Sequence, residues 1–159
     1  MKALPTLARL CAILAGLLMT IITLLTCGNL LLRNFTDDAI PGAFEMTALA
    51  TGAAIALFMP LCQVRQGNII VDFFTSGCSD ATNAVMDRIG ALVLSAIFAL
   101  LAWRTVIGGL SAYNANSATM LMGIPEWIVY AAMVPPFTLT AVIGITQAIV
   151  GFDAVKERH

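Results

Sequence analysis

The four cysteines are the best candidates for reactive side chains in this sequence. They stand at positions 11, 27, 62 and 78, and no two of them form a C-x-x-C pair. Membrane thiol oxidoreductases need reactive thiols on the oxidising side of the membrane. Cys11 and Cys27 lie within one apolar run, and the distribution of basic residues assigns Cys62 and Cys78 to the cytoplasmic side. The cysteines therefore argue against redox catalysis.

The other ionisable residues offer equally little for catalysis. His159 is the only histidine and the last residue, so bis-histidine haem ligation and histidine-based metal or nucleophile sites are not expected. We predict no cofactor, no metal site and no enzymatic activity. A net charge of −1 without a basic run also argues against a nucleic-acid partner.

The apolar composition predicts an integral membrane protein. Apolar residues make up 60% of the 159 residues and charged residues 11%, and the mean hydropathy is +0.93. The first apolar run, residues 10–32, contains no charge and as a helix is about 35 Å long, enough to cross a bilayer. Further spans are predicted at about 46–64, 89–113 and 127–150. We expect an all-α fold, a four-transmembrane-helix bundle that forms a single membrane domain over residues 1–159.

The connection between the second and third spans is long enough for a further helix. Ile70, Phe73 and Phe74 have i, i+3, i+4 spacing, and Asp72 faces elsewhere, which is typical of a short helix lying in the membrane interface. Such a helix either sets how the protein sits against a partner or is a linker that dips into the headgroups.

The basic residues predict the orientation. Six of them, Lys2, Arg9, Arg65, Arg88, Lys156 and Arg158, fall on one side of the spans, and only Arg33 and Arg104 fall on the other. Basic residues are enriched on the cytoplasmic side, so both termini are predicted to lie in the cytoplasm. Trp103, Trp127 and Tyr130 lie near the opposite membrane face, where amphipathic rings favour the lipid–water boundary.

All four spans carry small residues spaced mainly by four, which allow helix backbones to approach one another in lipid. The stripes are Ala12, Gly16, Thr20, Thr23 and Cys27 in the first span, Ala48, Gly52 and Ala56 in the second, Ala91, Ser95 and Ala99 in the third, and Thr140, Gly144 and Ala148 in the fourth. These stripes either pack within one bundle or dock onto a larger membrane partner.

Ionisable groups at membrane depth, which ion and proton pathways need, are scarce. No carboxylate lies deep in any span. Arg33 and Glu45 flank the first connection and could pair at the membrane boundary. Pro60, Pro135 and Pro136 have apolar neighbours, so we interpret them as kinks and not as the broken helices of a transport site.

Several short motifs occur in an order that resembles a known family. They are Arg33-Asn34-Phe35, Pro41 and Glu45, Arg65-x-Gly67-Asn68-Ile69-x-Val71-Asp72, Ser117, Ile124-Pro125-x-Trp127, Tyr130 and Pro135. Nearly the whole chain is similar to the small membrane subunit, or small permease, of tripartite ATP-independent periplasmic (TRAP) transporters. Asn68 departs from the family pattern, which often has histidine there.

The resemblance implies a non-enzymatic subunit of a bacterial inner-membrane importer of organic acids, driven by an ion gradient, usually of sodium. Its partners would be a large membrane subunit, a periplasmic substrate-binding protein and the surrounding membrane lipid. The residues expected to form the partner interface, or to set the register in the membrane, are Arg33, Glu45, Arg65, Asp72, Gly16, Gly52 and Trp127. The alternative function is a stand-alone, oligomeric small four-helix exporter.

Overall fold

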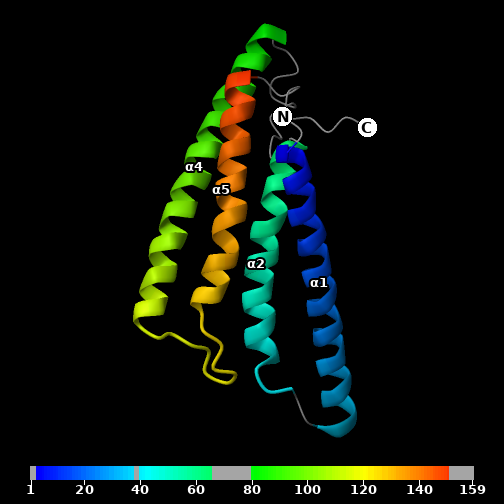
Figure 1. Ribbon diagram of the computed structural model, residues 1–159. Helices are drawn as coiled ribbons and strands as arrows, with labels where there is room; N and C mark the ends of the chain where they lie inside the picture. The colour runs from blue at the N-terminus through cyan, green and yellow to red at the C-terminus, as the bar shows by residue number, and fades with distance from the viewer. Residues whose placement is uncertain (1–2, 38–39, 66–79, 151–159) are drawn as a thin grey trace.

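The computed structural model describes residues 3–37, 40–65 and 80–150. They form four long helices (Figure 1), which are α1 (Ala3–Thr36), α2 (Ala43–Val64), α4 (Asp80–Asn114) and α5 (Trp127–Val150). Each predicted span lies within one of these helices, and all four are long and apolar enough to cross a membrane. The prediction of an all-α chain with four such helices is confirmed.

The interfacial helix predicted between the second and third spans falls in residues that the structure does not describe. Ile70, Phe73, Phe74 and Asp72 all lie outside the described residues.

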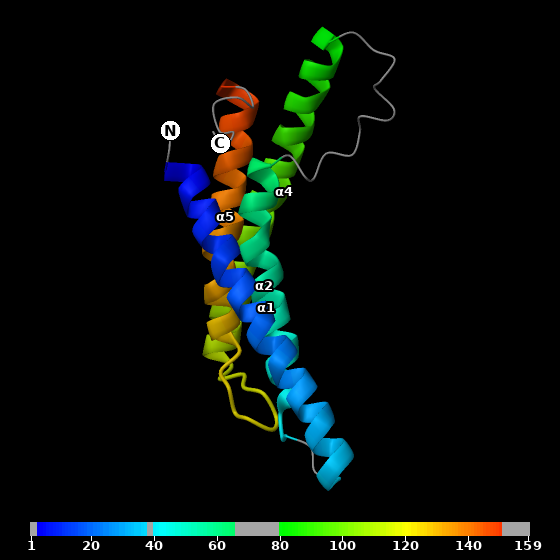
Figure 2. The same ribbon diagram turned by 90° about the vertical axis from the view of Figure 1, so that its right-hand side faces the viewer.

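The helices lie side by side in a row and do not close into the predicted bundle. α1 packs against α2, α2 against α5, and α5 against α4, with a smaller contact between α1 and α5. Figure 1 shows this order, and Figure 2 shows α1 crossing in front of α2 and α5. In lipid, apolar helix faces gain little by turning from acyl chains toward one another, so a closed core has no strong driving force. α1 shows the consequence, since only 6% of its most apolar stretch is buried.

The row has two ends. The loop end contains residues 40–42 and the connection 115–126, and the terminal end contains the start of α1 and the last turn of α5. At the terminal end, Ala8 of α1, Val64 of α2 and Ile143 of α5 form a small buried cluster. Ala8, Ala15 and Ile22 are the buried apolar residues of α1. They are seven residues apart, or about two turns, and so form one line along the helix.

Small residues bring α4 and α5 together. The Ser95 hydroxyl, which is buried, donates a hydrogen bond of 2.7 Å to the carbonyl oxygen of Ala141. A Cβ atom at Gly144 would lie 3.0 Å from the Cβ of Ser95 and 3.2 Å from the carbonyl oxygen of Ala91. Ala91 and Ser95 of the stripe predicted in the third span and Gly144 of that in the fourth thus take part in the α4–α5 contact, whereas Ala99 of the third span is exposed.

Two buried amides join α2 to α5 near the terminal end. The Gln63 side chain donates from Nε2 to Oε1 of Gln147 at 2.8 Å, and Gln147 donates from its own Nε2 to the backbone carbonyl of Gln63 at 3.0 Å. Both side chains are almost fully buried, with 2% and 1% of their surface exposed. Hydrogen bonds between helices in a membrane stabilise by roughly 0.6–2 kcal/mol each, so this pair is a principal attachment of α2 to α5.

The close contact at Gly144 predicts that Gly144→Val destabilises the chain. Its Cβ would meet the Ala91 backbone, which cannot move without shifting α4, and overpacking of this kind costs about 1–3 kcal/mol. The measurement is the thermal unfolding midpoint in detergent. Gly52→Val is the matched control, because no atom outside the local helix lies within 4 Å of a Cβ at Gly52. Equal midpoints for the two variants would contradict the packing described.

The paired amides predict strongly non-additive effects. Gln147→Leu removes the acceptor of the Gln63 side chain, and Gln63→Leu removes one donor to Gln147. Each single replacement is expected to lower stability by about 1–3 kcal/mol, because it leaves a buried polar group without this partner. The double Leu variant should lose less than the sum of the two. Additive losses in a double-mutant cycle would show that the pair does not act as a unit.

Candidate partner interface

Glu45 joins the start of α2 to the connection between α4 and α5. The carboxylate oxygens accept hydrogen bonds from the backbone N–H of Leu121, at 3.1 and 3.3 Å, and from that of Met122, at 3.3 Å. Bonds from N–H groups to a charged carboxylate are stronger than bonds between neutral groups. Glu45 therefore ties this connection to the first turn of α2.

The connection itself folds into a compact turn, which we call the loop hairpin, residues 117–126. A bridge joins Ala118 and Pro125. The N–H of Glu126 donates to the carbonyl of Ser117, and the N–H of Thr119 donates to that of Ile124, each at 3.0 Å. These bonds hold the two sides of the hairpin together, and Glu45 holds its tip.

Gly42 is required beneath the hairpin tip for two reasons. Its φ is +75°, a left-handed conformation that glycine adopts without a steric penalty. A Cβ atom at this position would also lie only 2.2 Å from Cγ of Met122. The turn before α2 and the hairpin tip are therefore in close contact.

The pairing suggested for Arg33 and Glu45 does not occur. Arg33 is exposed in the last turn of α1. Within the described residues there is no ion pair between Arg33 and Glu45, whose oxygens accept from the hairpin amides instead. A left-handed residue, Asp37 with φ of 56°, follows the end of α1.

Trp127 forms a ring contact with the end of α4. Its indole and the phenol ring of Tyr113 lie edge to face, with centroids 5.9 Å apart and an angle of 84° between planes. Trp127 is the first residue of α5 and Tyr113 lies next to the last residue of α4. The two rings close the base of the loop hairpin with amphipathic groups, which favour the membrane boundary.

Gly16 and Gly52, the predicted docking glycines, have open surroundings. No atom outside the local helix lies within 4 Å of a Cβ placed on either of them. The neighbouring stripe residues Thr20, Thr23 and Cys27 of α1 are exposed. Thr20 and Thr23 donate their hydroxyl hydrogens to carbonyls of their own helix, each at 2.9 Å. The small-residue surface of α1 therefore presents mainly apolar atoms and remains uncovered within this chain.

Of the two remaining predicted residues, the structure describes Arg65, which lies near the terminal end. Arg65 follows α2, where its backbone N–H donates to the carbonyl of Leu61 at 3.0 Å, and its side chain is exposed. Asp72 lies outside the described residues.

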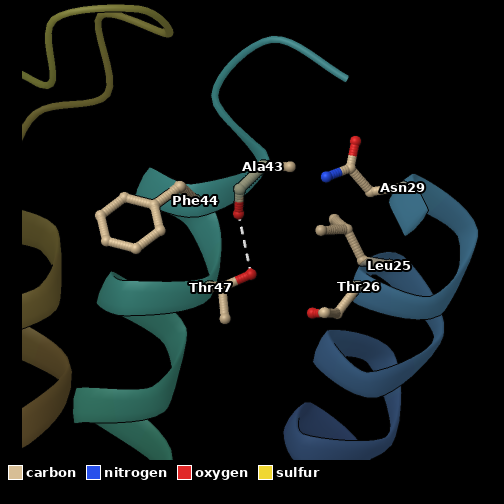
Figure 3. Close-up of a pocket in the computed structure, with 6 residues that line it drawn as sticks. All are labelled: Leu25, Thr26, Asn29, Ala43, Phe44 and Thr47. Atoms are coloured by element: carbon tan, nitrogen blue, oxygen red, sulfur yellow. Dashed lines mark hydrogen bonds between the residues drawn. The ribbon is translucent and has the colours of Figure 1, made fainter. Parts of the chain in front are cut away.

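A hollow of about 160 Å³ lies between α1 and α2 near the loop end (Figure 3). It is lined by Leu25, Thr26, Asn29, Ala43, Phe44 and Thr47. Asn29 accepts a 2.7 Å hydrogen bond from the N–H of Ile40, and thereby ties the turn before α2 to α1. Pockets for drug-sized ligands measure about 300–1,000 Å³, so this hollow is too small for such a ligand.

Sequence reasoning missed the polar residues that hold the helices together. Gln63, Gln147 and Asn29 each carry a polar amide in or beside a span, and each makes a hydrogen bond to another segment. The available signal was the amide itself, because an uncharged polar side chain in a lipid-facing helix needs a partner.

The Glu45 contact predicts that Glu45→Ala releases the hairpin tip. Without the carboxylate, the N–H groups of Leu121 and Met122 lose their acceptors and should exchange hydrogen several-fold faster. Exchange measured by mass spectrometry on a 117–126 peptide tests this. Glu126→Ala is the matched control, because the bond from Glu126 to Ser117 comes from the backbone. Unchanged exchange in Glu45→Ala would show that the contact does not hold the hairpin.

Comparison with known families identifies the chain. Residues 22–154 match the family described as "Tripartite ATP-independent periplasmic transporters, DctQ component". Comparisons with curated proteins and with solved structures give no match. The family match covers most of the chain and confirms the resemblance carried by the motifs around Arg33, Pro41 and Trp127. The chain therefore belongs to the DctQ family, the small multi-pass membrane component of TRAP transporters, and is a non-enzymatic transport component.

Proposed function

We propose that this chain is the static scaffold subunit of a tripartite importer. In this proposal it packs in the bacterial inner membrane beside a large membrane subunit that carries the substrate, while a periplasmic binding protein delivers it. The DctQ family match supports this arrangement because it assigns the chain to a multi-component transporter. The whole chain, residues 1–159, would act as one membrane domain.

The observation that carries the proposal is the open surface of the row. Gly16 and Gly52 lie in the middle turns of α1 and α2 and have no neighbour within 4 Å of a Cβ. Gly16 follows Ala15, so it lies about 100° around α1 from the line of buried residues Ala8, Ala15 and Ile22. Small residues at a helix surface allow close approach of another backbone. These surfaces therefore suit docking of a larger membrane protein.

The polar residues of the row support a scaffold more than a transport pathway. Gln63 and Gln147 satisfy one another through hydrogen bonds, and Glu45 is engaged by the loop hairpin. Transport of ions at membrane depth needs ionisable groups there. We assign the substrate and ion sites to the large subunit, with organic acids as substrates and sodium as the coupling ion, as the family resemblance implies.

The proposed orientation has both termini in the cytoplasm, because in the sequence six basic residues fall on one side of the predicted spans and two on the other. The loop end then faces the periplasm. In that position Arg33, Glu45 and Trp127 fix the register at the periplasmic boundary, and Arg65 and Asp72 fix it at the cytoplasmic boundary.

Bulky residues on the open faces should weaken assembly. Gly16→Leu and Gly52→Leu place side chains where the large subunit would approach, so less of that subunit should co-purify from native membranes in mild detergent. Uptake should fall in parallel while the relative rates for different substrates stay the same. The readouts are mass spectrometry of the purified complex and uptake into vesicles.

Gly90→Leu is the control, since Gly90 of α4 is equally open but does not belong to the small-residue stripes. Unfolding midpoints of the isolated variants separate a docking defect from a folding defect. If the large subunit is recovered in full with both variants, these faces do not form the interface. Recovery of the unaltered chain alone, as a stable oligomer that transports by itself, would favour the exporter function instead.

A further inference from the structure

The tip of the loop hairpin exposes three consecutive apolar side chains. Met120 is 99% exposed, Leu121 69% and Met122 46%. The sequence around them carries no charged residue from Thr105 through Pro125. A loop in water is normally polar, so an uncharged apolar tip indicates that something apolar covers it.

Two contacts fix the depth of this tip relative to the helices. The N–H groups of Leu121 and Met122 bind Glu45 in the first turn of α2, and Met122 lies directly over Gly42. α2 has only 22 residues and is therefore about 33 Å long, little more than the roughly 30 Å hydrocarbon core. Its first turn must lie at the hydrocarbon boundary, and the hairpin tip lies there with it.

The backbone N–H groups at the tip have acceptors within the protein, as an environment with little water requires. The N–H groups of Leu121 and Met122 donate to Glu45. The next two residues donate within the hairpin, Gly123 to the carbonyl of Thr119 at 3.0 Å and Ile124 to the Thr119 hydroxyl at 3.1 Å. Backbone N–H groups near the hydrocarbon must find acceptors within the protein, and these four N–H groups do so.

We propose that the hairpin tip, Met120 to Met122, inserts into the lipid leaflet at the loop end. The apolar side chains would contact the upper part of the acyl chains, while the Glu45 carboxylate holds the tip by its backbone. The tip continues the lipid-facing surface of this end, where Phe44 of α2 is 85% exposed, and the Tyr113–Trp127 ring pair marks the boundary at its base. The hairpin thereby anchors the α4–α5 pair at a fixed depth, independently of the large subunit.

Photo-crosslinking tests the proposal in the intact transporter in native membranes. Replacing Met120 by the photoreactive residue p-benzoylphenylalanine changes a fully exposed side chain and leaves the backbone bonds in place. The expected product is this chain with one phospholipid added, seen as a mass increase. Asn34, exposed just beyond the charge-free run of α1, is the control position and should give a much weaker lipid product. A crosslink from position 120 to a protein, or none at all, would overturn the proposal.

Fluorescence quenching supplies a second readout. A Met120→Trp variant, with Trp103 and Trp127 replaced by Phe, carries one tryptophan at the tip. Its emission should be quenched by phospholipids brominated on the acyl chain and little by iodide in the water. The reverse pattern would place the tip in water and refute insertion.

Discussion

The constraint on which this structure depends is that apolar helices in lipid have little reason to prefer one another. Lipid chains cover Leu and Ile as well as another helix does, so association needs small residues, buried polar groups or loops. α2 shows all three. It packs against α1, where the small residue Ala43 lines a hollow together with Thr26 and Asn29, it meets α5 through Gln63 and Gln147, and Glu45 holds the loop hairpin. The two helical pairs are joined through α2 and α5, by polar contacts near both ends of α2.

An open row of helices is unusual for a membrane protein that works alone, but it suits a subunit of a larger complex. Each helix of a closed bundle turns its small residues inward, whereas here the close contact of small residues is that of Ser95 in α4 with α5 at Ala141 and Gly144. Gly16 and Gly52 are left open. Membership of a multi-component transporter gives a reason for this, because surfaces kept free of internal packing are available to another subunit.

Composition and hydropathy were enough to predict the four spans. They were not enough to predict which helices and side chains pack against one another. Residues 10–32 have one possible structure in a bilayer, so the spans could be predicted from hydropathy alone. The row could not, because all four small-residue stripes look alike before it is known which of them meet. Glu45 shows the same limit at one residue. An opposite charge such as Arg33 is visible in sequence, whereas the amides of Leu121 and Met122 exist at almost every residue and carry no signal.

Helix length adds a constraint on how the row of helices is positioned across the membrane. The inner helices α2 and α5 have 22 and 24 residues, about 33 and 36 Å, close to the thickness of the hydrocarbon. The outer helices α1 and α4 have 34 and 35 residues, so they exceed it by several turns. In Figure 1, α1 extends past its neighbours at the loop end and α4 extends past them at the opposite end. The excess turns contain charged residues, Arg33 in α1 and Asp87 and Arg88 in α4. The inner helices therefore match the bilayer thickness, and the outer ones carry charge beyond it on opposite sides, which resists movement of the row along the membrane normal in either direction.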